Sequence, residues 1–253
     1  MNTRTKSIIV SIVSLGLAGA LFAAEPPPTP AFVETWGCNY KEGKDWSDKA
    51  KATDYMVDQV EKAGLTKVPG FHWTLKKGRV PVDTVWFDIH ANGTAFGAAR
   101  DAWDASGIGA GVDAAFDKVE DCTAGLSVMR PIYQQEGGDD DGNSLVANLA
   151  CTFKHGKGFD DMQDLSRHMG GVMQSFGDDG PRFAAVRQPI TRSTNYPDLF
   201  VFSLFDNVSH WTRYVGQLFS TEAGQRMRNH SDMILDCNIS LWDSQQVVTP
   251  DSD

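Results

Sequence analysis

The residues best suited to chemistry in this chain are Asp88 and His90, which lie two positions apart in the segment VDTVWFDIHAN. Side chains at i and i+2 of a strand share one face, so the carboxylate can orient the imidazole and raise its basicity. Trp86 on the same face offers a flat surface for an aromatic ligand, and Asn39 on a neighbouring strand could supply a hydrogen bond. The pattern predicts a catalytic pair, His90 and Asp88, in a site that binds ligand through Trp86 and Asn39. In the alternative interpretation, His90 lies in solvent at a strand end and Asp88 pairs with another group.

The other histidines show no comparable pattern. His168 and His230 lie on predicted helices without a partner at ligand spacing, and the sequence has no C-x-x-C or H-x-x-x-H motif. The sequence therefore predicts no metal site.

The predicted site belongs to a sequence that repeats internally. GCNYKEGKDWSD at 37–48 resembles ACTFKHGKGFDD at 150–161, and VDTVWFDIHAN at 82–92 resembles PDLFVFSLFDN at 197–207. The two repeating units, 25–133 and 145–246, are each too long for a solenoid repeat. We therefore predict a duplicated small domain. Its parts are a first unit at 25–133, an acidic Gly/Asp linker at 134–144, a second unit at 145–246 and a C-terminal tail at 247–253.

Periodicity gives the same order of elements in each unit. In the first unit, the strand FVETWGCNY stops at KEGK, a helix runs to Gly64, and the strands GFHWTL and DTVWFDIH follow. A broken helix over 94–120 leads into a last strand, CTAGLSVMR. The order β-α-β-β-α-β is that of the ferredoxin-like unit. The predicted fold class is therefore α+β, with two tandem ferredoxin-like units.

The repeated K-x-G-K motif at 41–44 and 154–157 has two interpretations. A lysine-bearing, glycine-rich loop at a helix N-terminus can bind an anion. Neither copy, however, has the G-x-x-x-x-G-K-[ST] pattern of a phosphate-binding loop. We favour a tight turn, in which the glycine adopts a backbone conformation that other residues avoid.

Strand alternation divides the first and third strands of each unit into two faces. The face predicted to lie under the helices comprises Trp36, Cys38, Tyr40, Val85, Phe87 and Ile89, with Leu149, Cys151, Phe153, Phe200, Phe202 and Leu204 in the second unit. The face predicted to point between the units comprises Thr35, Gly37, Asn39, Thr84, Trp86, Asp88 and His90, with Asn148, Ala150, Thr152, Leu199, Val201, Ser203 and Phe205. On this interpretation, the catalytic pair lies in a cavity between the units.

An apolar strand that ends in K-x-G-K, followed by an aromatic residue that opens a helix, resembles the first strand–helix joint of the dimeric α+β barrel superfamily. That superfamily includes antibiotic-biosynthesis monooxygenases and EthD-like and NIPSNAP-like proteins. LFSTEAGQRM at 218–227 is similar to their second-helix region, and the resemblance covers most of 32–243. It implies that the two units pack sheet to sheet as an intramolecular pseudo-dimer, an α+β barrel within one chain. It also implies a monooxygenase-like activity without a cofactor.

Haem-degrading members of this superfamily use an Asn–Trp–His set. Asn39 matches the asparagine, but the second helix of the first unit has no histidine at a comparable place. This departure argues against haem oxygenase activity, and we predict no cofactor.

Four cysteines in an exported chain indicate two disulfides, for which three pairings are possible. In the predicted unit the first strand lies antiparallel beside the fourth. Cys38 at the end of the first strand therefore meets Cys122 at the start of the fourth, and Cys151 and Cys237 repeat the arrangement. We predict these two disulfides, and a metal site is the alternative interpretation.

The N-terminus has the order of a cleavable secretory signal peptide. Arg4 and Lys6 precede an apolar run, and small residues surround Ala23 and Ala24. We predict a signal peptide at 1–24, a periplasmic or secreted protein, and no integral membrane segment after cleavage. The formal net charge of −10 becomes more negative when the two basic residues leave with the signal. This charge argues against nucleic acid and anionic membrane surfaces as partners.

Two classes of function remain. A hollow, partly polar barrel would favour a small-molecule protein, either a monooxygenase-like enzyme or a binder of an apolar or aromatic ligand. A barrel packed solidly with aromatic side chains would favour a non-catalytic interaction or structural module outside the cytoplasm. We favour the small-molecule class, although fold does not fix function.

Overall fold

The structure, a computed structural model, describes residues 29–135, 143–191 and 196–250, so the predicted signal peptide lies outside it. The strands are β1 (Ala31–Tyr40), β2 (Gly70–Lys77), β3 (Thr84–His90), β4 (Glu120–Gln134), β5 (Asn143–Phe153), β6 (Phe183–Pro189), β7 (Leu199–Phe205) and β8 (Leu235–Val248). The helices are α1 (Trp46–Lys62), α2 (Gly93–Ser106), α3 (Gly109–Phe116), α4 (Phe159–Ser175), α5 (Val208–Ser220) and α6 (Glu222–Ile234), with a 3-10 turn η1 (Gly177–Asp179). The order strand, helix, strand, strand, helix, strand is thus present in both halves, with each second helix broken in two.

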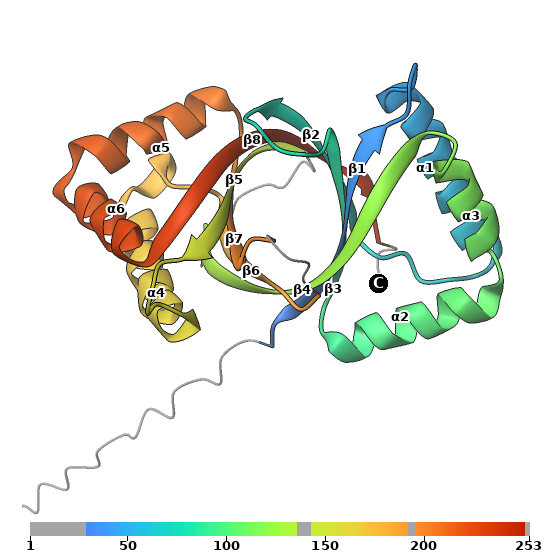
Figure 1. Cartoon of the computed structure of the whole chain (residues 1–253), viewed down its shortest axis with the longest axis horizontal. Helices are drawn as coiled ribbons and strands as arrows, with labels where there is room; N and C mark the ends of the chain where they lie inside the picture. The colour runs from blue at the N-terminus through green and yellow to red at the C-terminus, as the bar shows by residue number, and fades with distance from the viewer. Residues whose placement is uncertain (1–28, 136–142, 192–195, 251–253) are drawn as a thin grey trace, which may run out of the picture.

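The strands form one closed antiparallel barrel in the order β1-β3-β2-β8-β5-β7-β6-β4. Figure 1 shows the barrel between two helical layers, α1 to α3 on one side and α4 to α6 on the other. The long strands β4 and β8 join the halves. β4 pairs with β1 and, from Ser127 onward, with β6, whereas β8 pairs with β5 and, from Leu241 onward, with β2. The predicted α+β class is therefore confirmed as a mixed fold with a closed barrel.

Strands extend into both the predicted linker and the predicted C-terminal tail. Gln134, at the start of the predicted linker, ends β4, and Asn143 begins β5. Residues 136–142 lie outside the described residues. The predicted tail begins within β8, which ends at Val248. The linker prediction therefore applies to a shorter segment than 134–144, because barrel closure keeps the flanking residues in strands.

The K-x-G-K motif forms the predicted tight turn in both halves. Gly43 and Gly156 have φ angles of 74° and 76°, a left-handed conformation that glycine adopts without steric cost. The second lysine of each motif donates its backbone N–H to the carbonyl oxygen of the first at 2.9 Å. The first lysine of each motif, Lys41 or Lys154, donates its Nζ to the backbone carbonyl of Asp117 or Asp232. These lysines therefore join the turn to the segment before the last strand of their own half.

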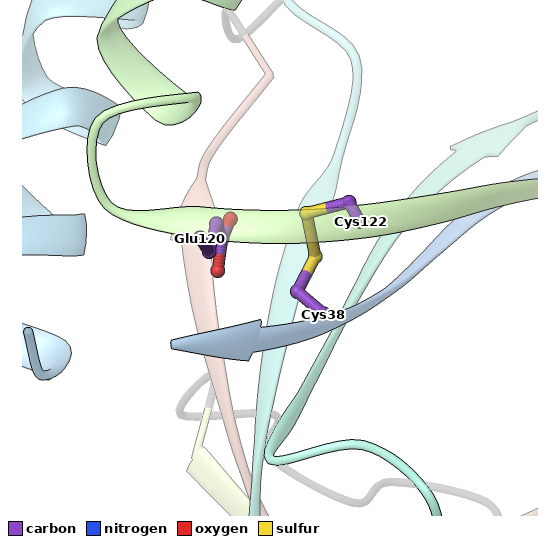
Figure 2. A group of neighbouring side chains, drawn as sticks. All are labelled: Cys38, Glu120 and Cys122. Carbon is purple, nitrogen blue, oxygen red and sulfur yellow. A yellow bond between two sulfur atoms is a disulfide. The ribbon is translucent and has the colours of Figure 1, made fainter. Parts of the chain in front are cut away.

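Both predicted disulfides are present, Cys38–Cys122 and Cys151–Cys237. Each joins directly paired residues of neighbouring strands, β1 with β4 and β5 with β8. Figure 2 shows the first of them, with the Glu120 side chain beside it. The bridged residues are 84 and 86 positions apart. On the chain-entropy model, each disulfide that closes a loop of this length stabilises the folded protein by about 4 kcal/mol.

The prediction of which face β3 and β7 turn to the helices was wrong. Trp36 pairs directly with Trp86, and Cys151 pairs directly with Leu199. Directly paired residues lie on the same side of a sheet. Trp86, Asp88 and His90 therefore lie under the helices of the first half, as do Leu199, Val201, Ser203 and Phe205 in the second. The barrel interior instead receives Phe87, Ile89, Phe202 and Leu204.

The assignment for β1 and β5 was correct, with Cys38 and Cys151 on the helix side. The error in β3 and β7 has a physical cause. Both faces of these strands are covered, one by helices and the other by the opposite wall of the barrel. Apolar residues therefore occur on both faces, and alternation no longer distinguishes them.

A buried ion pair stabilises the helical layer of the first half. Lys49 of α1 is fully buried, and its Nζ donates to Glu120 Oε2 at 2.8 Å and to Thr84 Oγ1 at 3.2 Å. In the aligned sequence of the second half, Met162, Leu235 and Leu199 occupy the corresponding positions and pack in one buried apolar cluster. The same place in the two halves is thus filled by a charged trio and by three apolar side chains.

Replacing Glu120 by Leu alone should lower the free energy of unfolding by about 3–5 kcal/mol, because the ammonium group of Lys49 would remain buried without its partner. Adding Lys49→Met and Thr84→Leu reproduces the apolar trio of the second half and should recover most of the loss. Urea unfolding of the oxidised protein measures both changes.

Glu222→Gln, which removes an exposed partner of Arg226, is the matched control and should change stability little. A Glu120→Leu variant as stable as the wild type would show that the buried pair does not hold α1 against the sheet.

Candidate functional site

A cavity of about 410 Å³ lies between the sheet of the first half and helices α1 and α2. Its wall is mainly apolar and includes Met56, Val57, Val60, Leu65, Ala95, Ala99 and Trp103. Four titratable side chains from β1, β3 and α2 also line it, namely Glu34, Asp88, His90 and Arg100. We call this space the helix-side cavity. An apolar pocket with a few convergent titratable groups is the usual form of a small-molecule site.

The elements bring these four groups together in a simple way. Glu34 of β1 pairs directly with Asp88 of β3, and Phe32 pairs with His90, so the three polar groups lie on one sheet face. Asn92 begins α2 directly after β3, since its side chain accepts a hydrogen bond from the N–H of Ala95 at 3.0 Å. The cap directs α2 back over the sheet.

Asp88 is bound to Trp86 rather than to His90. Trp86 Nε1 donates to Asp88 Oδ1 at 2.7 Å. Burial raises the pKa of Asp88 to about 7, and the nearby Glu34 carboxylate adds to the rise, whereas the Trp86 hydrogen bond and Arg100 oppose it. The structure places the predicted pair in one cavity, but the predicted orientation of the His90 imidazole by Asp88 is wrong. The tryptophan competes for the carboxylate because it lies two residues away on the same face.

His90 presents a buried nitrogen with no hydrogen-bond partner among the described residues. The residue is 6% exposed, and its ring meets Phe96 edge-on at 5.3 Å between centroids. Nε2 accepts or donates no hydrogen bond there and lies 4.0 Å from Glu34 Oε2. Burial lowers the pKa of His90, and the positive charge of Arg100 lowers it further. The ring is therefore neutral at pH 7, with a ring nitrogen available to a ligand.

Glu34 and Arg100 are two further charged groups of the cavity, and Lys67, which pairs with Glu61, also lines it. Arg100 Nη1 lies 3.7 Å from Glu34 Oε2, and the arginine side chain remains 42% exposed at the edge of the cavity. Burial raises the pKa of Glu34, and Arg100 partly offsets this rise. The cavity thus has one carboxyl group, that of Asp88, that can hold a proton near neutral pH, beside an imidazole that can accept one.

Asn39 lies outside this site. It is exposed near the end of β1, and its Nδ2 donates to the backbone carbonyl of Pro81 at 3.2 Å. The strand residue that pairs with His90 is Phe32, seven positions away. At about 3.3 Å per residue, this separation is roughly 23 Å. The predicted contribution of Asn39 to the same site is therefore wrong.

Two residues of the site, Glu34 and Arg100, were not predicted from the sequence. Glu34 shares strand parity with Trp36 and Cys38, which was a usable signal that it lies under the helices. Arg100 carried no signal, because its position depends on the direction of α2. A contact between His168 of α4 and His230 of α6, whose Nδ1 atoms are 3.0 Å apart, was also not predicted. Because the two histidines lie far apart in the sequence, their spacing does not match that of metal ligands. The packing of α4 against α6 brings them together.

Cys38, Cys122 and Glu120 form the one group of potential metal ligands found among the described residues. The two sulfur atoms are bonded to each other, as Figure 2 shows, and the Glu120 carboxylate accepts from Lys49. Thiolates, rather than disulfide sulfurs, are the usual sulfur ligands of metals. We therefore interpret this group as structural.

Within the described residues, none of the helices is both long and apolar enough to cross a membrane. The two disulfides agree with the oxidising, extracytoplasmic compartment predicted from the sequence.

No protein-family model and no curated protein matches the sequence. Solved structures do match its fold. A Fusobacterium nucleatum protein, named for a proposed monooxygenase activity, is 12% identical with a TM-score of 0.58 over 88% of this chain and 96% of its own. A dye-decolorizing peroxidase from Bacteroides thetaiotaomicron is 10% identical, with a TM-score of 0.52 over 87% and 94% of the two chains.

An anthrone oxidase-like protein is 13% identical, with a TM-score of 0.50 over 87% of this chain and 94% of its own. Identities this low show the fold alone. The α+β barrel architecture that the resemblance implied is thus confirmed, while the superfamily itself, the tandem duplication and the likeness to EthD-like and NIPSNAP-like proteins remain predictions. The chain has a mixed α+β fold with a closed barrel, and these solved structures match that fold.

Proposed function

We propose that this protein binds a small, flat, apolar or aromatic molecule in the helix-side cavity and removes a weakly acidic proton from it. The observation that carries the proposal is the buried Nε2 of His90, which has no hydrogen-bond partner in the described part of the chain and lines the cavity beside two carboxyl groups. An orphaned polar atom inside a folded protein is costly unless a ligand or water satisfies it. A ligand hydroxyl or acidic C–H group would meet that need.

The neighbouring groups would assist the transfer. The imidazolium formed when His90 takes the proton would lie 4.0 Å from the Glu34 carboxylate, whose negative charge stabilises it. Asp88, with a pKa of about 7, can hold or release a proton next to the same space. The apolar helix residues exclude water from the ligand, which strengthens these interactions.

The fold suggests an oxidation step after the proton transfer. The similar structures include an anthrone oxidase-like protein, and anthrone is a flat aromatic ketone with an acidic methylene group. With dioxygen as oxidant, the deprotonated methylene carbon would gain one oxygen atom as a carbonyl, and the second oxygen atom would leave as water with the two methylene hydrogens. This monooxygenase-like step needs no protein-bound cofactor, in line with the prediction from the sequence.

The interaction-module alternative loses support because the barrel is not packed solidly. Its interior contains a cavity of about 250 Å³ with a buried arginine. A hollow and partly polar interior was the feature that we expected of the small-molecule class.

The first test replaces His90 by Phe or by Gln in the full-length, oxidised protein, with anthrone as the probe. We expect both variants to lose at least tenfold in the rate of oxygen consumption and anthraquinone formation, because the proton acceptor is gone. Circular dichroism and thiol titration establish that each variant is folded with both disulfides formed.

His155→Gln changes an exposed histidine of the second half and serves as the control, with an unchanged rate. Wild-type protein that neither binds anthrone nor accelerates its oxidation, or a His90→Gln variant as fast as the wild type, would contradict the proposal.

The second test concerns the protonation of Asp88. Its pKa is raised from an ordinary 3.8 to about 7 in the folded protein, so folding favours the protonated form. This contribution to stability is fully present below about pH 4 and is lost as the pH rises through 7. We therefore expect the wild type to lose stability between pH 5 and pH 8 relative to Asp88→Asn, which keeps the acceptor for Trp86 and cannot ionise.

Thermal unfolding at the two pH values measures the difference. Asp101→Asn, on the exposed face of α2, is the matched control and should follow the wild type. If Asp88→Asn shows the same pH dependence as the wild type, Asp88 ionises as an ordinary surface carboxyl group.

A further inference from the structure

A second cavity lies inside the barrel, on the opposite side of β3 from the helix-side cavity. Its volume is about 250 Å³, and side chains from both halves line it. Phe87 and Ile89 project into it, whereas the alternate residues Asp88 and His90 line the helix-side cavity. Gln134 and Ser144, from the end of β4 and the beginning of β5, also line it. We call this space the barrel cavity.

The barrel cavity contains a buried cation, Arg187, for which the residues that the structure describes supply no counter-charge. Arg187 of β6 is 6% exposed, and among the described residues its guanidinium donates one hydrogen bond, to the hydroxyl of Thr35. Its carbon Cζ lies 4.3 Å from the ring centroid of Phe200 and 5.0 Å from that of Phe87. Burial lowers the pKa of Arg187 to about 10, so the group remains charged at neutral pH.

Within the described part of the chain, the surroundings of Arg187 offer no carboxylate partner. No Asp or Glu lines the barrel cavity among the described residues, although the whole chain has a net charge of −10. A second arginine, Arg182, also lines it and is paired with Asp206. A buried charge is strongly unfavourable unless it is paired, and contacts with aromatic faces offset only part of that cost. The guanidinium has further N–H donors that could form a fork with an anion.

We propose that the barrel cavity is a second binding site, which accepts a small aromatic carboxylate with its charged group on Arg187. The carboxylate would take the forked N–H groups of the guanidinium, and the ring would lie among Trp73, Phe202 and Met129, which form the apolar wall. The site is independent of the proposed function, because it lies on the other face of the sheet and shares no polar side chain with the helix-side cavity.

The size of the barrel cavity restricts the ligand. A volume of about 250 Å³ is just below the range of about 300–1,000 Å³ for drug-sized ligands, which favours a molecule with a single ring. Aromatic walls favour a planar ring over a puckered one of the same size. Benzoate meets both conditions and is the probe for the test.

Isothermal titration calorimetry of the full-length, oxidised protein with sodium benzoate tests the proposal, with benzamide and cyclohexanecarboxylate as matched probes. We expect the wild type to bind benzoate at least tenfold more tightly than either. Arg187→Met should weaken benzoate binding at least tenfold and leave benzamide binding unchanged. Arg187→Lys keeps the positive charge but loses the forked N–H donors. Its affinity for benzoate should therefore lie between those of the wild type and Arg187→Met.

Arg187→Met should remain folded, because an apolar side chain of similar length replaces a buried charge; its unfolding transition verifies this. Thr35→Val serves as a second variant that keeps the cation and should retain benzoate binding within a fewfold. Absence of benzoate binding by the wild type, or equal binding by Arg187→Met, would overturn the proposal.

His90→Phe separates this site from the helix-side cavity and should bind benzoate as the wild type does. Loss of benzoate binding in His90→Phe together with full binding in Arg187→Met would place the anion in the helix-side cavity and would overturn the barrel site. Conversely, a His90 variant that leaves anthrone oxidation unchanged would remove the proposed function and leave the barrel site intact.

Discussion

Closure of the barrel is the constraint on which the rest of the structure depends. The pairs β2–β8 and β4–β6 join the two halves and leave the sheet without an open edge. Closure requires β4 and β8 to be long, since each pairs first with a strand of its own half and then with one of the other. It also gives every strand an inner and an outer face, each covered by protein. Two separate cavities on the two faces of β3 are a direct result.

The two halves share this frame but fill it differently. In the aligned sequences, Asp88 and His90 correspond to Ser203 and Phe205. Phe205 is fully buried and packs against Tyr214, with ring centroids 5.2 Å apart, within an apolar cluster. The polar groups that line the cavity in the first half are thus replaced by ring packing in the second. The Lys49–Glu120 pair and its apolar counterparts follow the same division. At these aligned positions, the titratable side chains therefore lie in the first half.

Much of the frame could be predicted from the sequence. The repeat and the strand order were enough to place Cys38 beside Cys122, because a pairing of first and last strands is fixed by topology. The tight turn of each K-x-G-K motif was also predictable, because glycine readily adopts the positive φ angle that the turn requires.

The site was only partly predictable. Asp88 and His90 share a cavity as expected, but the choice of face failed because protein covers both faces of β3 and each face carries apolar residues. The position of Glu34 beside Asp88 and His90 depends on the register between β1 and β3, and a shift of one residue would turn Glu34 to the other face. Arg187 was not predicted as a site residue, because a single arginine in a short strand is usually solvent-exposed. Its burial results from the opposite wall of the barrel, which no local pattern reveals.

The placement of the disulfides has a consequence for how the molecule can come apart. Each bridge connects the first and last strands of one half, and neither crosses from one half to the other. The two halves are therefore closed covalently as separate modules, while the seams β2–β8 and β4–β6 are held by hydrogen bonds and packing alone. A seam of this kind is the place where two copies of a chain can exchange equivalent modules and close the barrel between them. The same seams that complete the monomer would then serve, unchanged, as the contacts of a domain-swapped dimer.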